Sequence, residues 1–597
     1  MSGEATTVAA PAYRAVAARL RAEGFARFSG LMGEDTAGLT TALVEHGARY
    51  VAARHETTAV AIADGYARAT GAIGLCVVSR GPGLLNALAA AAGADRAGTP
   101  LVLIAGDAPR GSHAAADLKA MDQAAAAAAA GLACVRPATT SELPAALDDA
   151  LALAATGRTV LLSLPLDVLE DVAAPSHAAA SPGAAGPSPA AASPGAAGPS
   201  PAAASPGAAG PSPAAASPGA AGPSPAAASP GAAGPLPAPA APVAPDAGAL
   251  DAAAARLGAA RRPLLLAGAG AHRSGAAPAL RRLAARLPCL LGTTLAAKDL
   301  FAGHPDDLGI VGGFSDAAAR AQLEQVDLVV AFGAGLNRFT TAALPAVDVV
   351  QVDHDPSRIG LLHPVALGVH GDAGLAAQAL AARLVAGDAP RPWREALARR
   401  ATRYEDRSTA TTVDPRTLLR ALDERLPAER NVAVDCGHFV GYPAQHLRVS
   451  GPERFFWSLH FGTLGTGLGL GLGVALAREH EPTVAVIGDG GLLMALGELE
   501  TLARTRAPLT LVILDDGAYA AEKHFLELHG EAGGLAVFGR ETDFAGIARR
   551  LGLEAITVRS TADLDGLRAG PFVLDCKVPL VRAGWYEEMI TGRYSER

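Results

Sequence analysis

Short apolar runs alternate with helical stretches along most of this chain. The first part combines a helix at residues 57–69 with apolar runs at 74–79, 101–104 and 159–164. The alternation returns twice, with apolar runs at 262–267, 287–292, 326–332 and 349–353, and then at 431–435, 483–487, 509–514 and 571–576. Strands that alternate with helices are typical of a parallel sheet covered on both faces. The pattern predicts an α/β protein with three doubly wound parallel-sheet domains.

One segment interrupts this pattern. The unit SPGAAGPSPAAA begins at Ser181 and starts again at Ser193, Ser205 and Ser217, and it decays after Ser229. A short period rich in Pro, Ala and Gly cannot bury a core, so we expect a disordered, low-complexity linker over residues 179–245. The predicted domains are then residues 1–178, 246–385 and 386–597.

Composition excludes several classes of protein. Half of the 597 residues are hydrophobic and 18% are charged, which is enough for several buried cores. No apolar run approaches the roughly 18 uncharged residues of a membrane span, and no signal segment is evident, so we expect a cytoplasmic protein with no membrane partner. A formal charge of −8 with scattered Lys and Arg argues against nucleic acid as a partner. The five widely spaced cysteines are expected to be free thiols.

Candidate chemistry follows two strands of the third domain. The run 483–487 leads into Gly488-Asp489-Gly490-Gly491 and a predicted helix at 492–504, and the run 509–514 leads into Asp515-Asp516-Gly517. The carboxyl ends of parallel strands open onto one edge of a sheet, so Asp489 and Asp516 can point at one small volume. Glycines let the backbone approach a phosphate, and two carboxylates beside a diphosphate suit Mg²⁺. The alternative is a turn followed by a solvated loop.

A second candidate lies in the first domain. Arg54-His55-Glu56 follows an apolar run at 50–53 and precedes the helix at 57–69. A carboxylate at that place can be partly buried and hydrogen-bonded. The alternative is an acidic residue that the helix dipole favours.

Five stretches in this order resemble the thiamine-diphosphate enzymes of the acetolactate synthase and 2-oxo acid decarboxylase superfamily, which includes enzymes like benzoylformate decarboxylase. The stretches are RHETTAVAIADGYARATG (54–71), SRGPGLLNAL (79–88), TPLVLIAGD (99–107), FGTLGTGLGLGLGVALA (461–477) and GDGG…LDDGAY (488–519). The resemblance covers the chain apart from the linker. It implies a pyrimidine-binding domain first, a middle domain, and a diphosphate-binding domain last, with thiamine diphosphate and Mg²⁺ as cofactors.

The resemblance also implies roles for single residues. Glu56 would hydrogen-bond N1′ of the cofactor's aminopyrimidine, and in this superfamily that glutamate meets the diphosphate site of another subunit. A homodimer or homotetramer with active sites at the interface is therefore implied. Asp489 and Asp516 would bind the metal together with the Ala518 carbonyl, although the family usually shows Asn-Asn at positions 515–516. The other residues implied in cofactor binding are Gly437, His438, Gly462, Leu464, Gly488, Gly490 and Gly491.

Three further residues are candidates for acid, base or anion-binding roles near the substrate. Glu34 lies in the loop after the first strand, and His438 and His460 flank the expected cofactor. Leu118-Lys119 stands where acetolactate synthases carry Phe-Gln. The middle domain lacks the Arg-Phe-Asp-Asp-Arg signature of flavin-binding members, which makes FAD doubtful, and Gly268-Ala269-Gly270 is too short a motif to indicate a dinucleotide.

The expected activity is thiamine-diphosphate-dependent decarboxylation of a small 2-oxo acid followed by carboligation, as in acetolactate synthase. Simple decarboxylation with release of an aldehyde is the first alternative. A non-catalytic regulatory paralogue is the second, and it would be expected to have lost Glu56 or a metal ligand, which this chain retains.

Overall fold

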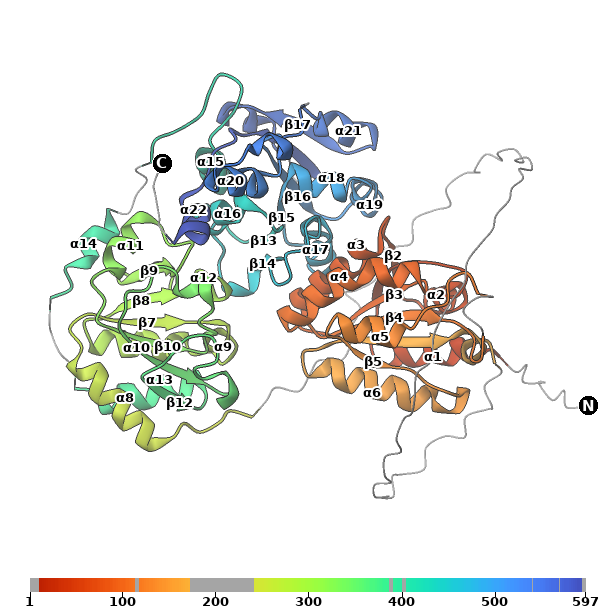
Figure 1. Cartoon of the computed structure of the whole chain (residues 1–597), viewed down its shortest axis with the longest axis horizontal. Coiled ribbons are helices and arrows are strands. Elements are labelled where there is room, and N and C mark those ends of the chain that lie inside the picture. Colours follow the sequence, from red (N-terminus) through yellow and green to blue (C-terminus); the bar gives the residue numbers. More distant parts are fainter. Residues whose placement is uncertain are drawn as a thin grey trace, which may run out of the picture.

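Three parallel sheets of six strands each organise the chain in the computed structural model (Figure 1). The structure describes residues 10–112, 117–171, 241–385, 390–399, 404–539, 541–568 and 570–592. Helices cover the sheets, so the predicted α/β class with three doubly wound parallel-sheet domains is confirmed. Most of the predicted linker lies outside the described residues, and the linker and the exact domain boundaries stay predictions.

The N-terminal sheet has the strand order β2-β1-β3-β4-β6-β5. Its strands are β1 Arg27–Leu31, β2 Arg49–Ala52, β3 Gly74–Val78, β4 Leu101–Asp107, β5 Ala133–Val135 and β6 Thr159–Pro165. Its helices are α1 Ala12–Ala22, α2 Ala37–Glu45, α3 Glu56–Thr70, α4 Pro82–Ala97, α5 Gln123–Ala129, α6 Leu143–Ala155 and α7 Leu166–Glu170. Strands β3, β4 and β6 are buried along their whole length, as expected for a sheet covered on both faces.

The middle sheet has a different order, β12-β11-β10-β7-β8-β9, which is the dinucleotide-fold order 3-2-1-4-5-6 read from its other edge. Its strands are β7 Pro263–Ala267, β8 Leu290–Thr293, β9 Asp307–Ile310, β10 Leu328–Phe332, β11 Asp348–Asp353 and β12 Leu367–His370. Its helices are α8 Ala247–Ala259, α9 Ala269–Arg273, α10 Ala277–Arg286, α11 Ala317–Leu323, α12 Arg338–Thr341 and α13 Ala373–Arg383, with α14 Trp393–Ala398 following. The strand predicted at 287–292 begins later because α10 continues to Arg286.

The C-terminal sheet repeats the order of the N-terminal one, as β14-β13-β15-β16-β18-β17. Its strands are β13 Asn431–Val434, β14 Phe455–Trp457, β15 Thr483–Gly488, β16 Leu509–Asp515, β17 Glu554–Val558 and β18 Phe572–Lys577. Its helices are α15 Pro415–Arg425, α16 Gly441–His446, α17 Gly467–Ala477, α18 Asp489–Met494, α19 Glu498–Thr505, α20 Ala520–Leu528, α21 Phe544–Arg550 and α22 Gly584–Thr591. The strand order reverses between β13 and β15, and ligands of open α/β sheets bind outside such a switch point.

Helices α3 and α17 join the N-terminal and C-terminal domains, and they lie side by side in Figure 1. Glycines make the close approach possible. A Cβ added at Gly65 would lie 2.1 Å from the Leu470 carbonyl oxygen, and one added at Gly473 would lie 2.1 Å from the Ile62 carbonyl oxygen. The glycine-rich run in α17 therefore serves the contact between domains.

The helix predicted at 492–504 is wrong in one respect, because it is two helices, α18 and α19, separated at residues 495–497. Glu498 begins α19, and its Oε1 accepts hydrogen bonds from the backbone N–H groups of Arg54 and His55, both at 2.9 Å. The buried carboxylate of Glu498 therefore contacts the N-terminal domain at the two residues that precede Glu56.

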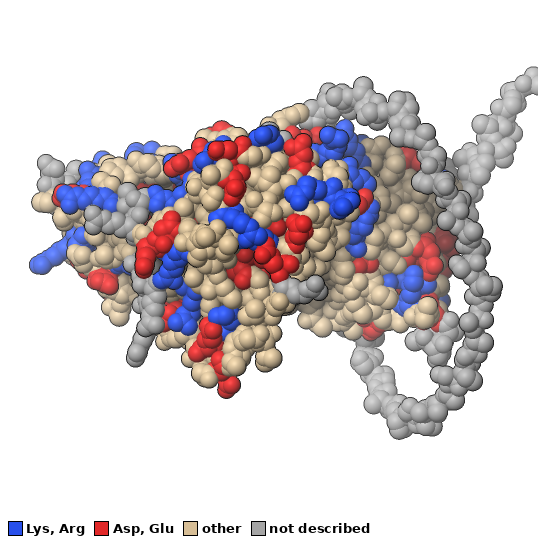
Figure 2. All heavy atoms as spheres, turned by 90° about the horizontal axis from the view of Figure 1, so that it is seen from above, with Lys and Arg blue, Asp and Glu red and all other residues tan. Residues whose placement is uncertain are grey.

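Charges are mixed on the face seen in Figure 2, where acidic and basic side chains alternate over the described part of the molecule. This face carries no broad region of one sign. Among the described residues, no helix has the length and apolar character needed to cross a membrane.

Candidate active site

A cavity of about 590 Å³ opens at the carboxyl ends of β13, β15 and β16. Its size lies within the range of small-molecule sites. The loops after these strands form one wall of the cavity. Residues of α12 in the middle domain, of α22, and of the segment before α17 form the remaining walls. Ten residues predicted from the sequence line this one cavity: Gly437, His438, Gly462, Leu464, Gly488, Asp489, Gly490, Gly491, Asp516 and Ala518.

Asp489 connects the two loops that carry the predicted metal ligands. Its Oδ1 accepts a hydrogen bond from the N–H of Gly490 and its Oδ2 accepts one from the N–H of Gly517, each at 2.8 Å. Burial and the neighbouring carboxylates of Asp516 and Asp515 raise the pKa of Asp489, and burial also raises the pKa of Asp516. No ion pair to Asp489 or Asp516 is present within the described residues. A bound cation would relieve the repulsion between them.

Glycines keep the loop after β15 free of side chains. A Cβ added at Gly490 would lie 2.6 Å from the ring of Tyr519, and one added at Gly491 would lie 2.6 Å from Oδ2 of Asp435. Any larger residue would collide with these neighbours, so the loop presents backbone to the cavity. This is the arrangement expected where backbone must approach a phosphate.

Asp435 is a site residue that the sequence analysis did not single out. Its fully buried carboxylate accepts hydrogen bonds from the N–H groups of Gly465 (2.8 Å) and Gly467 (2.9 Å) and from Oγ of Ser458 (3.1 Å). Burial raises the pKa of Asp435 to about 6. Asp435 thereby fixes the segment that places Gly462 and Leu464 in the cavity wall. The sequence feature that could have indicated Asp435 is its position at the carboxyl end of a predicted strand; it directly follows β13, as Asp489 directly follows β15.

His438 lies in the cavity wall as a buried, neutral ring. Its Nε2 accepts a hydrogen bond from the N–H of Ala583 at 3.0 Å, and burial lowers its pKa to about 3. At neutral pH Nε2 therefore carries no proton that it could donate, and its lone pair already accepts the hydrogen bond from Ala583. His460 stacks on Trp457 with ring centroids 5.2 Å apart, burial lowers its pKa to about 3, and it is not among the cavity-lining residues. Catalytic roles for either histidine stay predictions.

The candidates of the N-terminal domain lie apart from the cavity of the same chain. Glu56 is the first residue of α3, is only 8% exposed, and its Oε2 accepts a hydrogen bond from Nδ2 of Asn86 at 3.0 Å. Glu34 is largely exposed and pairs with Nζ of Lys119 at 3.1 Å. Neither glutamate lines the cavity. One chain therefore carries two halves of the predicted site on separate domains.

The metal site predicted from the sequence uses few side chains. In the described ranges, no three His, Cys, Asp or Glu side chains are gathered as a metal-binding cluster. Two carboxylates and a backbone carbonyl still fit Mg²⁺, because Mg²⁺ retains several waters and binds substrate phosphates in addition to one or two carboxylates. The residues present therefore fit a magnesium diphosphate group.

The fold and this site define a doubly wound α/β protein with a glycine-lined cavity at a switch point of its C-terminal sheet. Comparison with protein-family models places the N-terminal TPP binding domain of thiamine pyrophosphate enzymes at residues 11–129, the central domain at 250–380 and the C-terminal TPP binding domain at 435–571. The chain belongs to the thiamine pyrophosphate enzyme family.

Its relatives carry different names. A Pseudomonas aeruginosa protein named "probable 2-ketoarginine decarboxylase" is 30% identical, covering 91% of this chain and 88% of its own length. Acetolactate synthase isozyme 2 large subunit of Escherichia coli is 26% identical, covering 83% and 81%. Sulfoacetaldehyde acetyltransferase of Rhodobacter capsulatus is 31% identical over 54% of this chain, and the match spans 60% of that relative.

A solved structure supports the fold. The crystal structure of a Mycobacterium smegmatis protein named a "putative thiamin diphosphate-dependent enzyme" superposes with a TM-score of 0.67. It is 24% identical and covers 95% of this chain and 99% of its own. At this identity the likeness extends to the fold alone.

Proposed function

We propose that this protein decarboxylates a 2-oxo acid with thiamine diphosphate and Mg²⁺ and transfers the remaining fragment to a second carbonyl compound, in the manner of acetolactate synthase. The observation that carries the proposal is the pair of carboxylates of Asp489, which is buried, and Asp516, which is partly buried; they share a glycine-lined cavity, and neither forms an ion pair within the described chain. The relative named acetolactate synthase, which matches over most of both chains, supports the same reaction class.

The cavity residues would hold the cofactor as follows. Asp489, Asp516 and the carbonyl of Ala518 would bind Mg²⁺, and the backbone of the Gly488–Gly491 loop would receive the diphosphate. Leu464 would support the thiazolium from the wall that Asp435 orders. When bound, the cofactor supplies the electron sink that decarboxylation of a 2-oxo acid requires.

Glu56 would complete the site from a second copy of the chain. Its Oε2 is held by Asn86, and within the described residues no hydrogen bond to its Oε1 is present. That oxygen would share a proton with a ring nitrogen of the aminopyrimidine, which is favoured by the low-dielectric position of the carboxylate. This arrangement would require a homodimer or homotetramer, because Glu56 is not among the described residues that line the cavity of its own chain.

A pyruvate assay tests the proposal. Purified protein with thiamine diphosphate and Mg²⁺, without FAD, is expected to release CO₂ and form acetolactate in a 1:1 ratio. Release of acetaldehyde in place of acetolactate would support simple decarboxylation. Failure to bind thiamine diphosphate at all would refute the proposed function.

A specific observation favours one second candidate, a decarboxylase for a cationic 2-oxo acid. Glu522 in the first turn of α20 lines the cavity, and no cation pairs with it in the part of the chain described. Its neighbour Lys523 pairs with Glu527 at 2.6 Å instead. An unpaired carboxylate in the cavity would attract a guanidinium group, and the relative that covers 91% of this chain is named for 2-ketoarginine.

The substrate test compares 2-ketoarginine with pyruvate in wild-type protein and in Glu522→Gln. If Glu522 binds the substrate's cation, the variant loses about tenfold or more in kcat/KM for 2-ketoarginine and keeps that for pyruvate. Equal changes for both substrates would exclude this role.

A further inference from the structure

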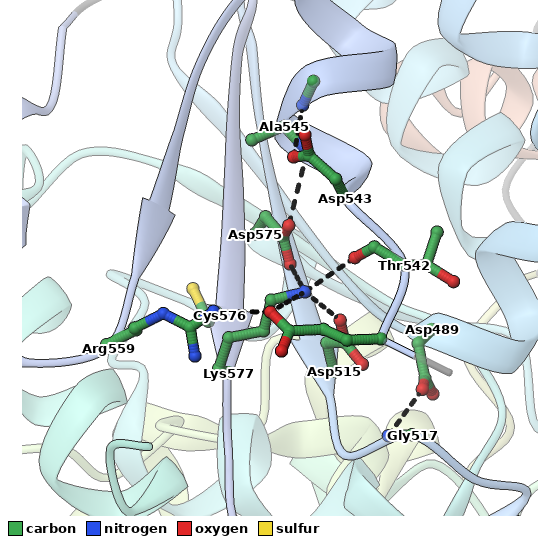
Figure 3. A network of polar contacts seen from close by, with 12 residues as sticks. Asp489, Asp515, Gly517, Thr542, Asp543, Ala545, Arg559, Asp575, Cys576 and Lys577 are labelled. Carbon is green, nitrogen blue, oxygen red and sulfur yellow. Dashed lines mark hydrogen bonds and ion pairs between the residues drawn. The ribbon is translucent and has the colours of Figure 1, made fainter. Parts of the chain in front are cut away.

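Lys577 lies in a buried polar network beside the predicted metal site (Figure 3). Its Nζ donates hydrogen bonds to Oδ2 of Asp515 and, at 2.7 Å, to the carbonyl oxygen of Thr542, and it forms an ion pair with Oδ1 of Asp575 at 3.0 Å. Two of the three N–H donors of the ammonium group are used in hydrogen bonds, and Oδ1 of Asp575, which accepts no hydrogen bond, contacts the group as an ion pair. Lys577 is 4% exposed, Asp515 6% and Asp575 fully buried.

Strand register brings these side chains together. β16 and β18 are parallel neighbours, and Asp515, the last residue of β16, lies directly opposite Lys577, the last residue of β18. Asp515 immediately precedes the predicted ligand Asp516, yet Asp515 is not among the residues that line the cavity. The two consecutive carboxylates therefore face different surroundings, one the cavity and the other Lys577.

The charges around this edge of the sheet are strongly unequal. Asp489 and Asp516 follow strands β15 and β16, Asp515 ends β16, and Asp575 lies within β18. Among the described residues, Lys577 is the cation that contacts two of these four, Asp515 and Asp575. Glu541 also lies 3.6 Å from Lys577, but Arg559 pairs with it as well. A diphosphate is itself anionic, and repulsion between like charges is strong in a buried setting. A carboxylate at position 515 without Lys577 would oppose diphosphate binding.

We propose that Lys577 is a positioning residue of the cofactor site. It neutralises Asp515 and holds that carboxylate away from the cavity, which leaves Asp516 and Asp489 to bind the metal. This inference rests on the magnesium diphosphate site proposed above. It assigns a role in the site to a residue 61 positions beyond Asp516 in the sequence.

Three variants test the proposal by their affinity for thiamine diphosphate at saturating Mg²⁺. The readout is protein fluorescence, because Trp585 lines the cavity and the chain has three tryptophans in total. Lys577→Met is expected to raise the Kd for thiamine diphosphate about tenfold or more, as for other coupled buried charges. Adding Asp515→Asn to Lys577→Met is expected to return Kd to within about threefold of wild type, since the unpaired carboxylate beside the metal is removed.

The matched control is Lys577→Met with Asp575→Asn. It also leaves one unpaired buried carboxylate, but Asp575 lies opposite Ile513, two positions further from the site than Asp515. This control is expected to keep the weakened Kd, while the melting temperatures of the two double variants stay close. If Lys577→Met alone does not fold, the comparison between the double variants decides.

Equal rescue by Asp515→Asn and Asp575→Asn, or rescue by neither, would overturn the proposal and leave Lys577 a general stabiliser of the sheet. Unchanged affinity in Lys577→Met would overturn it too. Wild-type protein that fails to bind thiamine diphosphate would instead contradict the proposed function, so the two failures can be told apart.

Discussion

Acid should destabilise this protein through His438, and the size of the effect can be worked from its surroundings. The ring is 6% exposed, packs against the rings of His524 (5.0 Å) and Tyr586 (5.2 Å), and accepts at Nε2 from Ala583. Burial, with smaller contributions from His524 and Arg582, lowers the pKa of His438 from 6.5 to about 3. The folded state therefore keeps the ring neutral over a range in which the unfolded chain takes up a proton.

The sign follows from this difference in proton binding. A histidine with a lowered pKa in the folded state has its full stabilising effect above pH 6.5, and the effect is lost progressively as the pH falls toward 3. The loss is about 1.4 kcal/mol per pH unit in that window. Between pH 7.5 and pH 5.0, His438 alone should therefore lower the free energy of unfolding by about 2 kcal/mol.

His438→Gln isolates this contribution, because glutamine retains an acceptor for Ala583 and does not titrate. Urea unfolding, followed by tryptophan fluorescence, gives the free energy of unfolding at both pH values. The variant should lose about 2 kcal/mol less than wild type between pH 7.5 and 5.0. His446 and His460, whose pKa values burial also lowers, are common to both proteins and cancel. His480→Gln, at an exposed histidine, serves as control. Equal losses in wild type and His438→Gln would refute the reasoning.

Three shorter predictions concern the domain contact and the site. Gly473→Ala should lower the free energy of unfolding by about 1–3 kcal/mol, because its Cβ would meet the Ile62 carbonyl, whereas Gly534→Ala, in open space, should change it little in the same thermal melts. Glu56→Gln should bind thiamine diphosphate normally but lose about 10²–10⁴-fold in turnover, as measured by CO₂ release. Asp516→Ala, which removes the side-chain oxygens, should raise the Kd for thiamine diphosphate at fixed Mg²⁺ about tenfold or more in a fluorescence titration; unchanged affinity would exclude the Asp516 side chain as a ligand.

The periodicity of apolar residues was enough to predict most strands of the three sheets, because buried parallel strands are short and nearly continuous in hydrophobicity. It was also enough to predict that Asp489 and Asp516 share a cavity, since both follow neighbouring parallel strands. It could not predict the interruption at residues 495–497. That break depends on where Glu498 meets the backbone of Arg54 and His55 in another domain.

The pairing of Lys577 with Asp515 could not be predicted from the sequence for a related reason. Whether these residues face each other depends on the register of β16 against β18, and a shift of one position would send each side chain to the opposite face. The role of Asp435 was missed because its partners are backbone N–H groups of a distant segment. Such groups are present in almost every residue, so no residue type in the sequence indicates them. Local patterns thus predicted the elements, and contacts across the sheet decided which polar residues support the site.

The separation of Glu56 from the cavity leads to the most direct test of assembly. If each site combines Glu56 of one copy with Asp489 and Asp516 of another, chains with Glu56→Gln and chains with Asp489→Ala are each almost inactive alone. Co-expressed in equal amounts, they should pair at random, and one of the two sites in each mixed dimer then has only wild-type residues. About a quarter of wild-type activity should return, as expected for a symmetric two-fold assembly. If Glu56 instead served the cavity of its own chain, every site in the mixture would carry one defect and no activity would return.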